Sequence, residues 1–146
     1  MDRCDILIKF QKVDAEAKIP VFAKTGDAGM DMYSNVEMTI MPGEITVIPT
    51  GVKMELPEGY VALVWDKSGI ALKNGMKTMG GVLDSGFRGE VQIIMTNLSK
   101  NPFLVLKHTK VAQILIQKVE CPKIEITEVL SESERGESAF GSTGLS

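Results

Sequence analysis

Residues 45–65 read ITVIPTGVKMELPEGYVALVW, and their pattern indicates the fold class. Two short apolar segments, Ile45–Pro49 and Val52–Leu56, are followed by a Pro-Glu-Gly turn and then by the apolar run Tyr60–Trp65. Short β-branched and aromatic runs separated by glycine and proline are typical of strands in sandwiches and barrels. The stretch therefore predicts three successive strands.

The same pattern continues on both sides of this stretch. Of the 146 residues, 13 are Val, 13 are Ile and 9 are Thr, and 14 Gly and 6 Pro residues supply the turns. Only Ser68–Lys73, which is followed by Asn-Gly, predicts a helix of one or two turns. We expect an all-β, jelly-roll-like sandwich or Greek-key barrel with one short helix. Its further strands are expected at Asp5–Phe10, Val36–Met41, Gly89–Thr96, Phe103–Leu106, Val111–Val119 and Ile124–Leu130.

The size and composition of the chain exclude several classes of protein. At 15.9 kDa with 44% hydrophobic residues, the chain can bury one core and is too apolar for a disordered protein. No apolar run approaches the roughly 18 residues that a membrane-spanning helix needs. The net charge of −3 and the pI near 5.2 give no reason to expect nucleic acid as a partner. Any phosphate group must therefore be bound by a local site.

The cysteines, the histidine and the first residues limit the chemistry and the location. Cys4 and Cys121 are too few for a disulfide framework and predict two reduced thiols. His108 is the only histidine, which excludes multi-histidine zinc sites and any catalytic triad not built on it. The start Met-Asp-Arg-Cys-Asp has an acid where a secretory signal has a basic region. We expect a cytoplasmic protein, with a nuclear or virus-encoded one left open.

Two interior segments place charged residues next to small ones. Residues 28–34 (AGMDMYS) put Asp31 at a strand entry, where an acid is commonly a turn or capping residue. Residues 66–69 (DKSG) follow a strand and precede the predicted helix, so their amides, the Ser68 hydroxyl and the Lys67 charge could bind an anion. The alternative is that Ser68 is a plain N-cap.

Two further segments combine small and polar residues. Residues 80–90 (GGVLDSGFRGE) hold four glycines around Asp84 and Phe87, which predicts a hairpin whose backbone is closely approached. The hairpin backbone could bind a flat heterocycle, with Phe87 packed on a sugar. In residues 110–113 (KVAQ), Gln113 lies in an apolar strand and must satisfy either backbone groups or a ligand. The carboxylates of these segments, together with a triphosphate, would suit Mg²⁺ held mostly by phosphate oxygens and water.

The C-terminal residues 131–146 (SESERGESAFGSTGLS) lack strand alternation and predict a flexible tail. Arg135 and Phe140 stand alone among small residues, and residues 141–144 (GSTG) offer two hydroxyls and flexible amides suited to phosphate oxygens. A tail that orders only on a ligand fits both observations. We therefore expect a domain over residues 1–130 and a separate tail over residues 131–146.

Five segments, in this order, resemble the five motifs of the trimeric dUTPase family. They are AGMDMYS, DKSGIA, GVLDSGFRGE, KVAQILI and RGESAFGSTG, and they extend from residue 28 to residue 144. The resemblance implies hydrolysis of dUTP to dUMP and pyrophosphate, which limits uracil incorporation into DNA and supplies dUMP for dTMP synthesis. It also implies Mg²⁺ on the triphosphate and a jelly-roll homotrimer whose active sites are shared between subunits.

The resemblance assigns roles to individual residues of the third motif. Asp84 resembles the acid that orients and deprotonates the attacking water at the α-phosphorus. Phe87 takes the place of the family's tyrosine, which packs under the deoxyribose and leaves no room for a 2′-hydroxyl. The backbone of Gly81, Val82 and Leu83 resembles the slot that reads uracil, and the residues expected to flank that slot are Thr78 and Gln92.

The other motifs are implied to hold the phosphate chain. Asp31 matches an acid near the metal-bound phosphates, with no direct protein ligand to the Mg²⁺. The groups that match the phosphate-binding residues are Lys67, Ser68, Gly69 and Gln113. The tail is implied to close over the nucleotide, with Phe140 stacked on uracil and the γ-phosphate held by Arg135, Gly141, Ser142 and Thr143.

The chain departs from the family's motifs at several positions, which affects rate and affinity more than the reaction. Lys67 replaces an arginine, Phe87 lacks the tyrosine hydroxyl, and residues 108–110 (His-Thr-Lys) replace Gly-Asp-Arg. Ser138 and Ala139 stand where the family favours glycines, which reduces the flexibility of the tail.

The sequence leaves two other functions open. A dCTP deaminase, or a bifunctional deaminase–diphosphatase on the same fold, lacks an aspartate in this hairpin setting and depends on a catalytic glutamate that this sequence does not place. Glu90 is available, but the dUTPase family often has a glutamate there without deaminating. Ammonia release from dCTP would identify such an enzyme. A non-enzymatic nucleotide sensor could retain the fold, but the intact Asp84 and tail argue against it, and pyrophosphate release from dUTP would decide.

Overall fold

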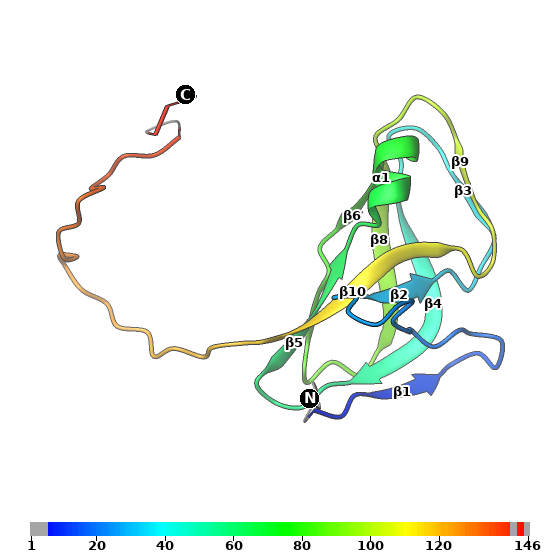
Figure 1. The fold of residues 1–146 in the computed structure, drawn as a ribbon, viewed down its shortest axis with the longest axis horizontal. Helices are drawn as coiled ribbons and strands as arrows, with labels where there is room; N and C mark the ends of the chain where they lie inside the picture. Colours follow the sequence, from blue (N-terminus) through cyan, green and yellow to red (C-terminus); the bar gives the residue numbers. More distant parts are fainter. Residues whose placement is uncertain (1–5, 141–142, 145–146) are drawn as a thin grey trace.

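The computed structural model describes residues 6–140 and 143–144, and it has the expected all-β fold (Figure 1). One four-stranded sheet has the order β1-β4-β8-β6, a second has the order β2-β10-β5-β7, and β3 pairs with β9. All of these pairings are antiparallel. Because most neighbouring strands are far apart in the sequence, the topology is that of a jelly-roll-like sandwich with one short helix.

The bounds of the elements follow the apolar runs of the sequence. The first half holds β1 (Lys9–Lys12), β2 (Met30–Tyr33), β3 (Met38–Ile40), β4 (Ile45–Glu55) and β5 (Tyr60–Trp65). The second half holds α1 (Ser68–Asn74), β6 (Met76–Met79), β7 (Val82–Asp84), β8 (Glu90–Asn97), β9 (Phe103–Val105) and β10 (Lys110–Lys118). No helix in the described part of the chain is long and apolar enough to cross a membrane.

The core lies between the two larger sheets because their strands alternate in exposure. Val91, Ile93 and Met95 of β8 point inward and are at most 1% exposed. They belong to one apolar cluster with Met32 of β2 and Ile114 of β10, which come from the opposite sheet. Period-two alternation places one face of each strand in the core and the other toward solvent.

Two strands predicted in the first half differ from the structure. The segments Ile45–Pro49 and Val52–Leu56 form the single strand β4, with a register shift between Pro49 and Lys53. Gly51 lies within this irregularity at φ +70°, and the side chain of Glu90 accepts a hydrogen bond from its N–H at 2.8 Å. A β-bulge bends a strand without ending it, so a turn residue in the sequence does not separate two strands here.

The N-terminal strand is also shifted from the predicted Asp5–Phe10. Strand β1 covers Lys9–Lys12 and pairs with Val52–Glu55 of β4, and Asp5 lies outside the described residues. The pairing partner therefore determines where the strand begins, rather than the apolar alternation alone.

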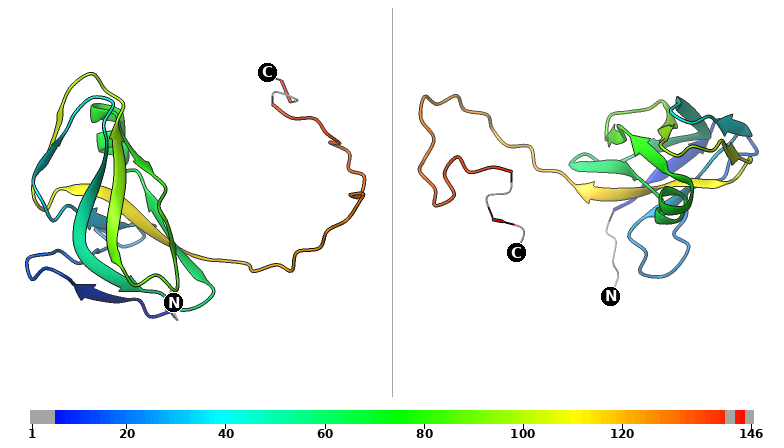
Figure 2. Two further views of the ribbon diagram at one scale, coloured as in Figure 1. Left: turned by 180° about the vertical axis from the view of Figure 1, so that it is seen from behind. Right: turned by 90° about the horizontal axis from the view of Figure 1, so that it is seen from above.

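The strand predicted at Ile124–Leu130 is not formed. Residues 120–130 contain no strand, and Ile124 and Ile126 are 93% and 96% exposed. Beyond β10, the chain leaves the two sheets and runs as an extended arc away from them, as all the views show (Figures 1 and 2). Alternation alone does not make a strand, because backbone N–H and C=O groups need a neighbouring strand to pair with.

Candidate active site

Three neighbouring strands bring together residues from three of the predicted motifs. The register of β2, β10 and β5 places Asp31, Gln113 and Trp65 in one row. The Nε2 group of Gln113 donates to the backbone oxygen of Asp66 at 2.9 Å. A Cβ atom at Gly29 would lie 2.6 Å from Gln113 Oε1, so the glycine of the first motif leaves room for this amide.

Asp31 is the electrostatic centre of this row. Its side chain is 5% exposed and forms ion pairs with Lys67 and, at 2.7 Å, with Lys110. Burial opposes ionisation, but the hydrogen bonds and charges of Lys110 and Lys67 outweigh it, so the pKa of Asp31 lies below its usual range. The same contact with Asp31 raises the pKa of Lys110. Two ammonium groups thus surround one carboxylate, and the excess positive charge suits an anionic ligand.

The predicted anion-binding turn lies at the start of α1. Lys67 occupies the N-cap position, and no side chain caps the helix, so the alternative N-cap role for Ser68 is wrong. Ser68 and Gly69 follow Lys67 in the first turn and are both exposed. Their hydroxyl and amide groups are therefore accessible to a ligand that approaches Lys67.

One departure from the motif pattern, His108, lies at a backbone position that favours glycine. His108 lies at φ +68°, in the left-handed region that glycine adopts without a steric penalty, and Gly is the residue the family favours there. Its Nε2 atom is 2.9 Å from the backbone oxygen of Glu16. The only histidine of the chain is thus engaged with the 13–18 loop, two residues before Lys110 reaches Asp31.

A pocket of about 360 Å³ opens at the edge where the two larger sheets meet, and Gly81 is one of the residues that line it. Gly81 lies at φ +92°, and its carbonyl accepts a hydrogen bond from the N–H of Val64 at 2.8 Å. A Cβ atom on Gly81 would lie 3.0 Å from the Val64 backbone oxygen. The predicted close approach to this glycine-rich backbone is found, and the approaching group is β5. The pocket is lined by Leu63, Val64, Trp65, Lys77, Thr78, Gly80, Gly81 and Val82.

The pairing predicted for residues 80–90 is wrong, because this segment is not a hairpin within one sheet. Strand β7 pairs with β5, whereas β8 pairs with β4 and β6. Gly80 and Gly81 both have positive φ and turn the chain from the edge of one sheet to the edge of the other. The glycines therefore build a crossing between sheets, and the pocket lies at that crossing.

Asp84 ends β7 and points its side chain to solvent. The next turn brings the N–H of Phe87 to the Asp84 carbonyl at 3.1 Å. A Cβ atom on Gly89 would lie 2.6 Å from the Phe87 ring, so the ring rests on the backbone of that glycine. The turn thus presents one carboxylate and one aromatic face, three residues apart, on an exposed surface.

Within one chain, Asp84 lies far from the row of Asp31, Gln113 and Trp65 (the Asp31 row). Asp84 pairs with Val61, whereas Trp65 of the row lies four residues further along β5, which is about 13 Å at the usual rise of a strand. Across the sheet, β7 and β2 are three strand spacings apart, which is about 14 Å. A single chain therefore does not place the Asp84 carboxylate beside Lys67 and Asp31.

The described residues of the tail contact neither Asp84 nor the Asp31 row. Arg135 donates from Nε to the backbone oxygen of Ser138 at 3.0 Å, and Phe140 is fully exposed. Thr143 is also exposed, while Gly141 and Ser142 lie outside the described residues. The arc of the tail in Figure 2 runs clear of both sheets.

Two remaining predicted positions lie on β8. Gln92 is exposed on the outer face of the sheet, opposite Pro49 of β4. Glu90 starts the strand and is bonded to the N–H of Gly51 in the β4 bulge. The acid considered for a deaminase therefore has a structural partner in this chain.

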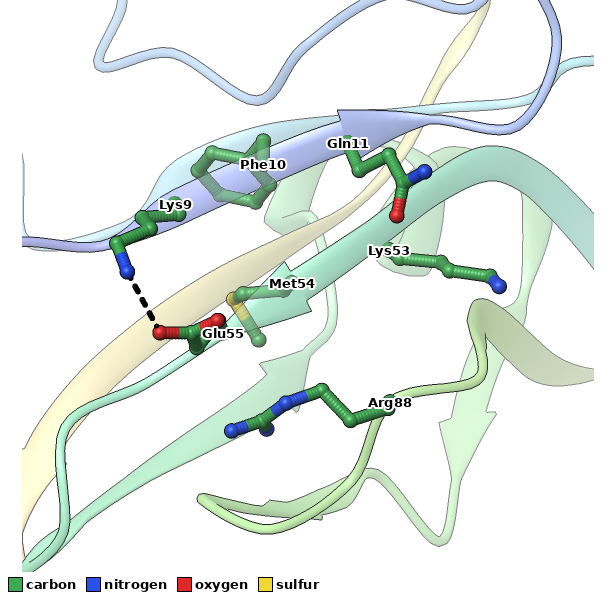
Figure 3. A pocket seen from close by; sticks show the side chains of 7 residues that line it. All are labelled: Lys9, Phe10, Gln11, Lys53, Met54, Glu55 and Arg88. Carbon is green, nitrogen blue, oxygen red and sulfur yellow. Dashed lines mark hydrogen bonds and ion pairs between the residues drawn. The ribbon is translucent and has the colours of Figure 1, made fainter.

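A second hollow of about 420 Å³ lies at the β1 edge, outside all predicted site residues (Figure 3). Phe10 and Met54 are among its apolar side chains, and Lys9 pairs with Glu55 at 2.8 Å. Arg88 reaches toward it from the turn that follows β7. No motif predicts this hollow, because its wall combines two strands and a turn that are distant in the chain.

The structure adds four residues to those predicted. Lys110 contacts Asp31, and its signal in the sequence was a basic residue directly before a buried strand. Trp65 and Lys77 line the pocket, and the signal for Trp65 was its position as the only tryptophan, at a strand end. Asp66 contacts Lys77 and Thr78, and no sequence signal predicts that contact.

The structure is thus an all-β sandwich with a small pocket at one sheet edge and two lysines on Asp31, an arrangement that suits a small anionic ligand. A family model described as dUTPase matches residues 15–144. The deoxyuridine 5′-triphosphate nucleotidohydrolases of Clostridioides difficile and Alkaliphilus metalliredigens are 46% and 44% identical over 140 residues, which cover 94% of this chain and 98% and 97% of those proteins. Staphylococcus bacteriophage 80alpha dUTPase with dUPNHPP has a similar structure, with a TM-score of 0.87, 28% identity, and coverage of 95% of this chain and 99% of that one. The chain belongs to the dUTPase family.

Proposed function

We propose that the chain hydrolyses dUTP to dUMP and pyrophosphate, with water attacking the α-phosphorus. The observation that carries this proposal is the family match over residues 15–144, which includes Asp84 at the exposed end of β7. A carboxylate in this position can accept a proton from water, and a positioned general base typically contributes about 10²–10⁴-fold to the rate. No covalent nucleophile is required.

The nucleoside end of the substrate is assigned to the pocket and the turn beside it. The backbone of Gly81, Val82 and Leu83 would read the uracil edge, with Thr78 and Gln92 nearby. Phe87 would pack against the deoxyribose, and its ring, fixed on Gly89, would leave no room for a 2′-hydroxyl. This discrimination against ribose is steric, since the ring lacks the hydroxyl of a tyrosine.

The phosphate chain is assigned to the Asp31 row and the start of α1. Lys67 would bind a phosphate as a point charge, while Ser68, Gly69 and Gln113 would donate hydrogen bonds. The carboxylate of Asp31 is already paired with two lysines, so it fits a nearby Mg²⁺ held by phosphate oxygens and water rather than by direct protein ligands. The ion would neutralise charge on the phosphates when bound.

We propose a homotrimer in which each active site is shared between subunits. The separation of Asp84 from the Asp31 row within one chain supports this, because both groups are needed around one triphosphate. The assignment gives the pocket and Asp84 to one subunit and the phosphate-binding row to another.

Exposed apolar side chains also support an oligomer. Val47, Ile94 and Met79 lie side by side across β4, β8 and β6, on the outer face of the sheet. They are 44%, 40% and 39% exposed, and Ile124 and Ile126 of the segment after β10 are almost fully exposed. Apolar patches that a single chain leaves uncovered commonly mark protein–protein interfaces.

Residues 131–146 are proposed to act as a tail that closes over the nucleotide, separate from a domain over residues 1–130. Phe140, which is fully exposed, would stack on uracil. Arg135 and Thr143, with Gly141 and Ser142, would hold the γ-phosphate. Ordering of the tail only when substrate binds would remove water from the site before reaction.

A nucleotide panel tests the proposed reaction. Pyrophosphate release is measured from dUTP, UTP, dTTP and dCTP, with and without Mg²⁺, and ammonia release is measured from dCTP. We expect rapid release from dUTP with Mg²⁺, little from the other three nucleotides, and no ammonia. Ammonia from dCTP would identify a deaminase, and no release from any nucleotide would identify a binding protein.

Replacing Lys67 by arginine is expected to raise kcat/KM for dUTP modestly, by about threefold. The guanidinium fork can bind two oxygens at once, whereas the ammonium binds as a point charge. Steady-state kinetics of Lys67→Arg measure this, with Lys73→Arg in the last turn of α1 as the matched control. A fall in kcat/KM with an unchanged fold would mean that the site is adapted to lysine.

A further inference from the structure

Asp66 connects four groups at the edge where the two sheets meet. Its Oδ1 atom accepts hydrogen bonds from the N–H of Thr78 at 2.6 Å and from the Thr78 hydroxyl at 2.7 Å. Its Oδ2 atom pairs with Lys77 at 2.7 Å. Its backbone oxygen accepts from Gln113 Nε2 at 2.9 Å. One residue thus contacts the pocket wall through its side chain and the Asp31 row through its backbone.

These contacts matter because β6 is an edge strand. Among the residues that the structure describes, β6 pairs only with β8, and its other edge has no strand partner there. Asp66, which follows β5 of the opposite sheet, supplies an acceptor to that free edge at Thr78. A second link, from backbone to backbone, is the hydrogen bond that the N–H of Val64 donates to the Gly81 carbonyl in the corner after β6. The pocket lies between these two links.

The carboxylate of Asp66 is charged over the working pH range. Partial burial opposes ionisation, but Lys77 and the two donors of Thr78 outweigh it, so the pKa of Asp66 lies below its usual range. An ionised acceptor with three partners makes stronger hydrogen bonds than a neutral one would. One edge of β6 is held by the ladder with β8, and the other edge is held at Thr78 by these charge-assisted bonds.

We propose that Asp66 is a positioning residue that sets the width of the pyrimidine pocket by holding β6 against β5. This inference rests on the proposed assignment of the pocket to the uracil ring. The carboxylate of Asp66 is bonded to Thr78 and Lys77, so we assign it no contact with the substrate or the reacting atoms. Its removal should therefore weaken nucleotide binding more than it slows the chemical step at Asp84.

The experiment uses Asp66→Ala, Asp66→Asn and Asp66→Glu in the full-length chain. Trp65 is the only tryptophan and lines the pocket, so its emission reports binding of α,β-imido-dUTP directly. We expect Asp66→Ala to raise the Kd and the KM for dUTP at least about tenfold, with kcat within about threefold, because hydrogen bonds to a charged group are lost. Asp66→Asn, which keeps one acceptor oxygen, should be intermediate, and Asp66→Glu should recover part of the affinity.

A stability control separates positioning from general destabilisation. Thr50→Val removes a buried hydroxyl that bonds to the backbone of Val91 in the core, and neither residue lines the pocket. We expect this variant to lower the Tm without changing the Kd. If Asp66→Ala also lowers the Tm but leaves the Kd unchanged, Asp66 is structural only and the inference is wrong.

The wild-type protein distinguishes failure of the proposed function from failure of the inference about Asp66. If it fails to hydrolyse dUTP, the proposed function fails, whatever the Asp66 variants do. If it hydrolyses dUTP but Trp65 emission does not respond to α,β-imido-dUTP, the pocket is not the base site and the inference about Asp66 falls. Hydrolysis, a Trp65 response and a raised Kd in Asp66→Ala together support it.

Discussion

Replacing Asp84 by asparagine is expected to lower kcat for dUTP at least about 100-fold while leaving nucleotide affinity nearly unchanged. The amide keeps the shape of the side chain but cannot accept a proton from water. Asp84 is exposed at the end of β7. The change therefore adds no buried unsatisfied group and should leave the fold intact.

Two measurements make this expectation specific to catalysis. Binding of α,β-imido-dUTP to Asp84→Asn, followed by Trp65 emission, should match the wild-type protein within about threefold. Glu37→Gln, which neutralises an exposed acid in the loop between β2 and β3, serves as the matched control and should keep full activity. Turnover of Asp84→Asn within about tenfold of wild type would show that Asp84 is not the general base.

Removing residues 131–146 is expected to lower kcat/KM about 100-fold or more. The truncation deletes the arginine assigned to the γ-phosphate and the aromatic ring assigned to uracil, each of which contributes through a charge-assisted bond or stacking. Steady-state kinetics with dUTP measure the loss.

Stability should change little on the same truncation. Among the described residues of the tail, Arg135 bonds to Ser138, and residues 131–140 are exposed. The Tm should therefore stay within a few degrees, and full-length Glu137→Gln, which changes the tail's charge alone, should stay active. A large fall in Tm would show that the tail stabilises the assembly rather than closing over the nucleotide.

Local sequence patterns predicted most strands, because alternation and turn residues act over a few positions. Tyr60–Trp65 was predicted with the bounds that β5 has, and Val111–Val119 differs from β10 by one residue at each end. The short helix was predicted from Ser68 and ends one residue later than expected. Each of these elements has a continuous apolar run and a clear turn signal beside it.

Pairing between strands could not be predicted in the same way. The joining of two predicted segments into β4 depends on a bulge at Gly51, and the pairing of β7 with β5 depends on sheet order. Ile124–Leu130 alternates like a strand but pairs with no strand of residues 6–140. Partner choice is a long-range property that alternation does not encode.

The same limit applies to the candidate site. The motifs predict Asp31, Lys67 and Gln113 as site residues. The sheet register places Asp31 opposite Gln113, and an ion pair joins Asp31 to Lys67 at the start of α1. Lys110 and Asp66 were not predicted as site residues, because their contacts cross between strands whose order is set only by the fold. Both residues lie at the first position of a recognised motif, yet the motif does not indicate which side chains they contact.

In the proposed trimer, each active site combines Asp84 of one subunit with the tail of another. Two inactive proteins test it: Asp84→Asn with a full tail, and wild-type Asp84 truncated after Leu130. Unfolded together in equal amounts and refolded, they should form mixed trimers in which a working site needs an intact Asp84 and an intact tail from different chains.

Random assembly makes each of these two conditions true about half of the time, so roughly a quarter of wild-type activity should return. Native mass spectrometry of the same sample confirms that mixed trimers have formed. If activity stays at background while mixed trimers are present, each site is built from a single chain and the shared-site account is contradicted.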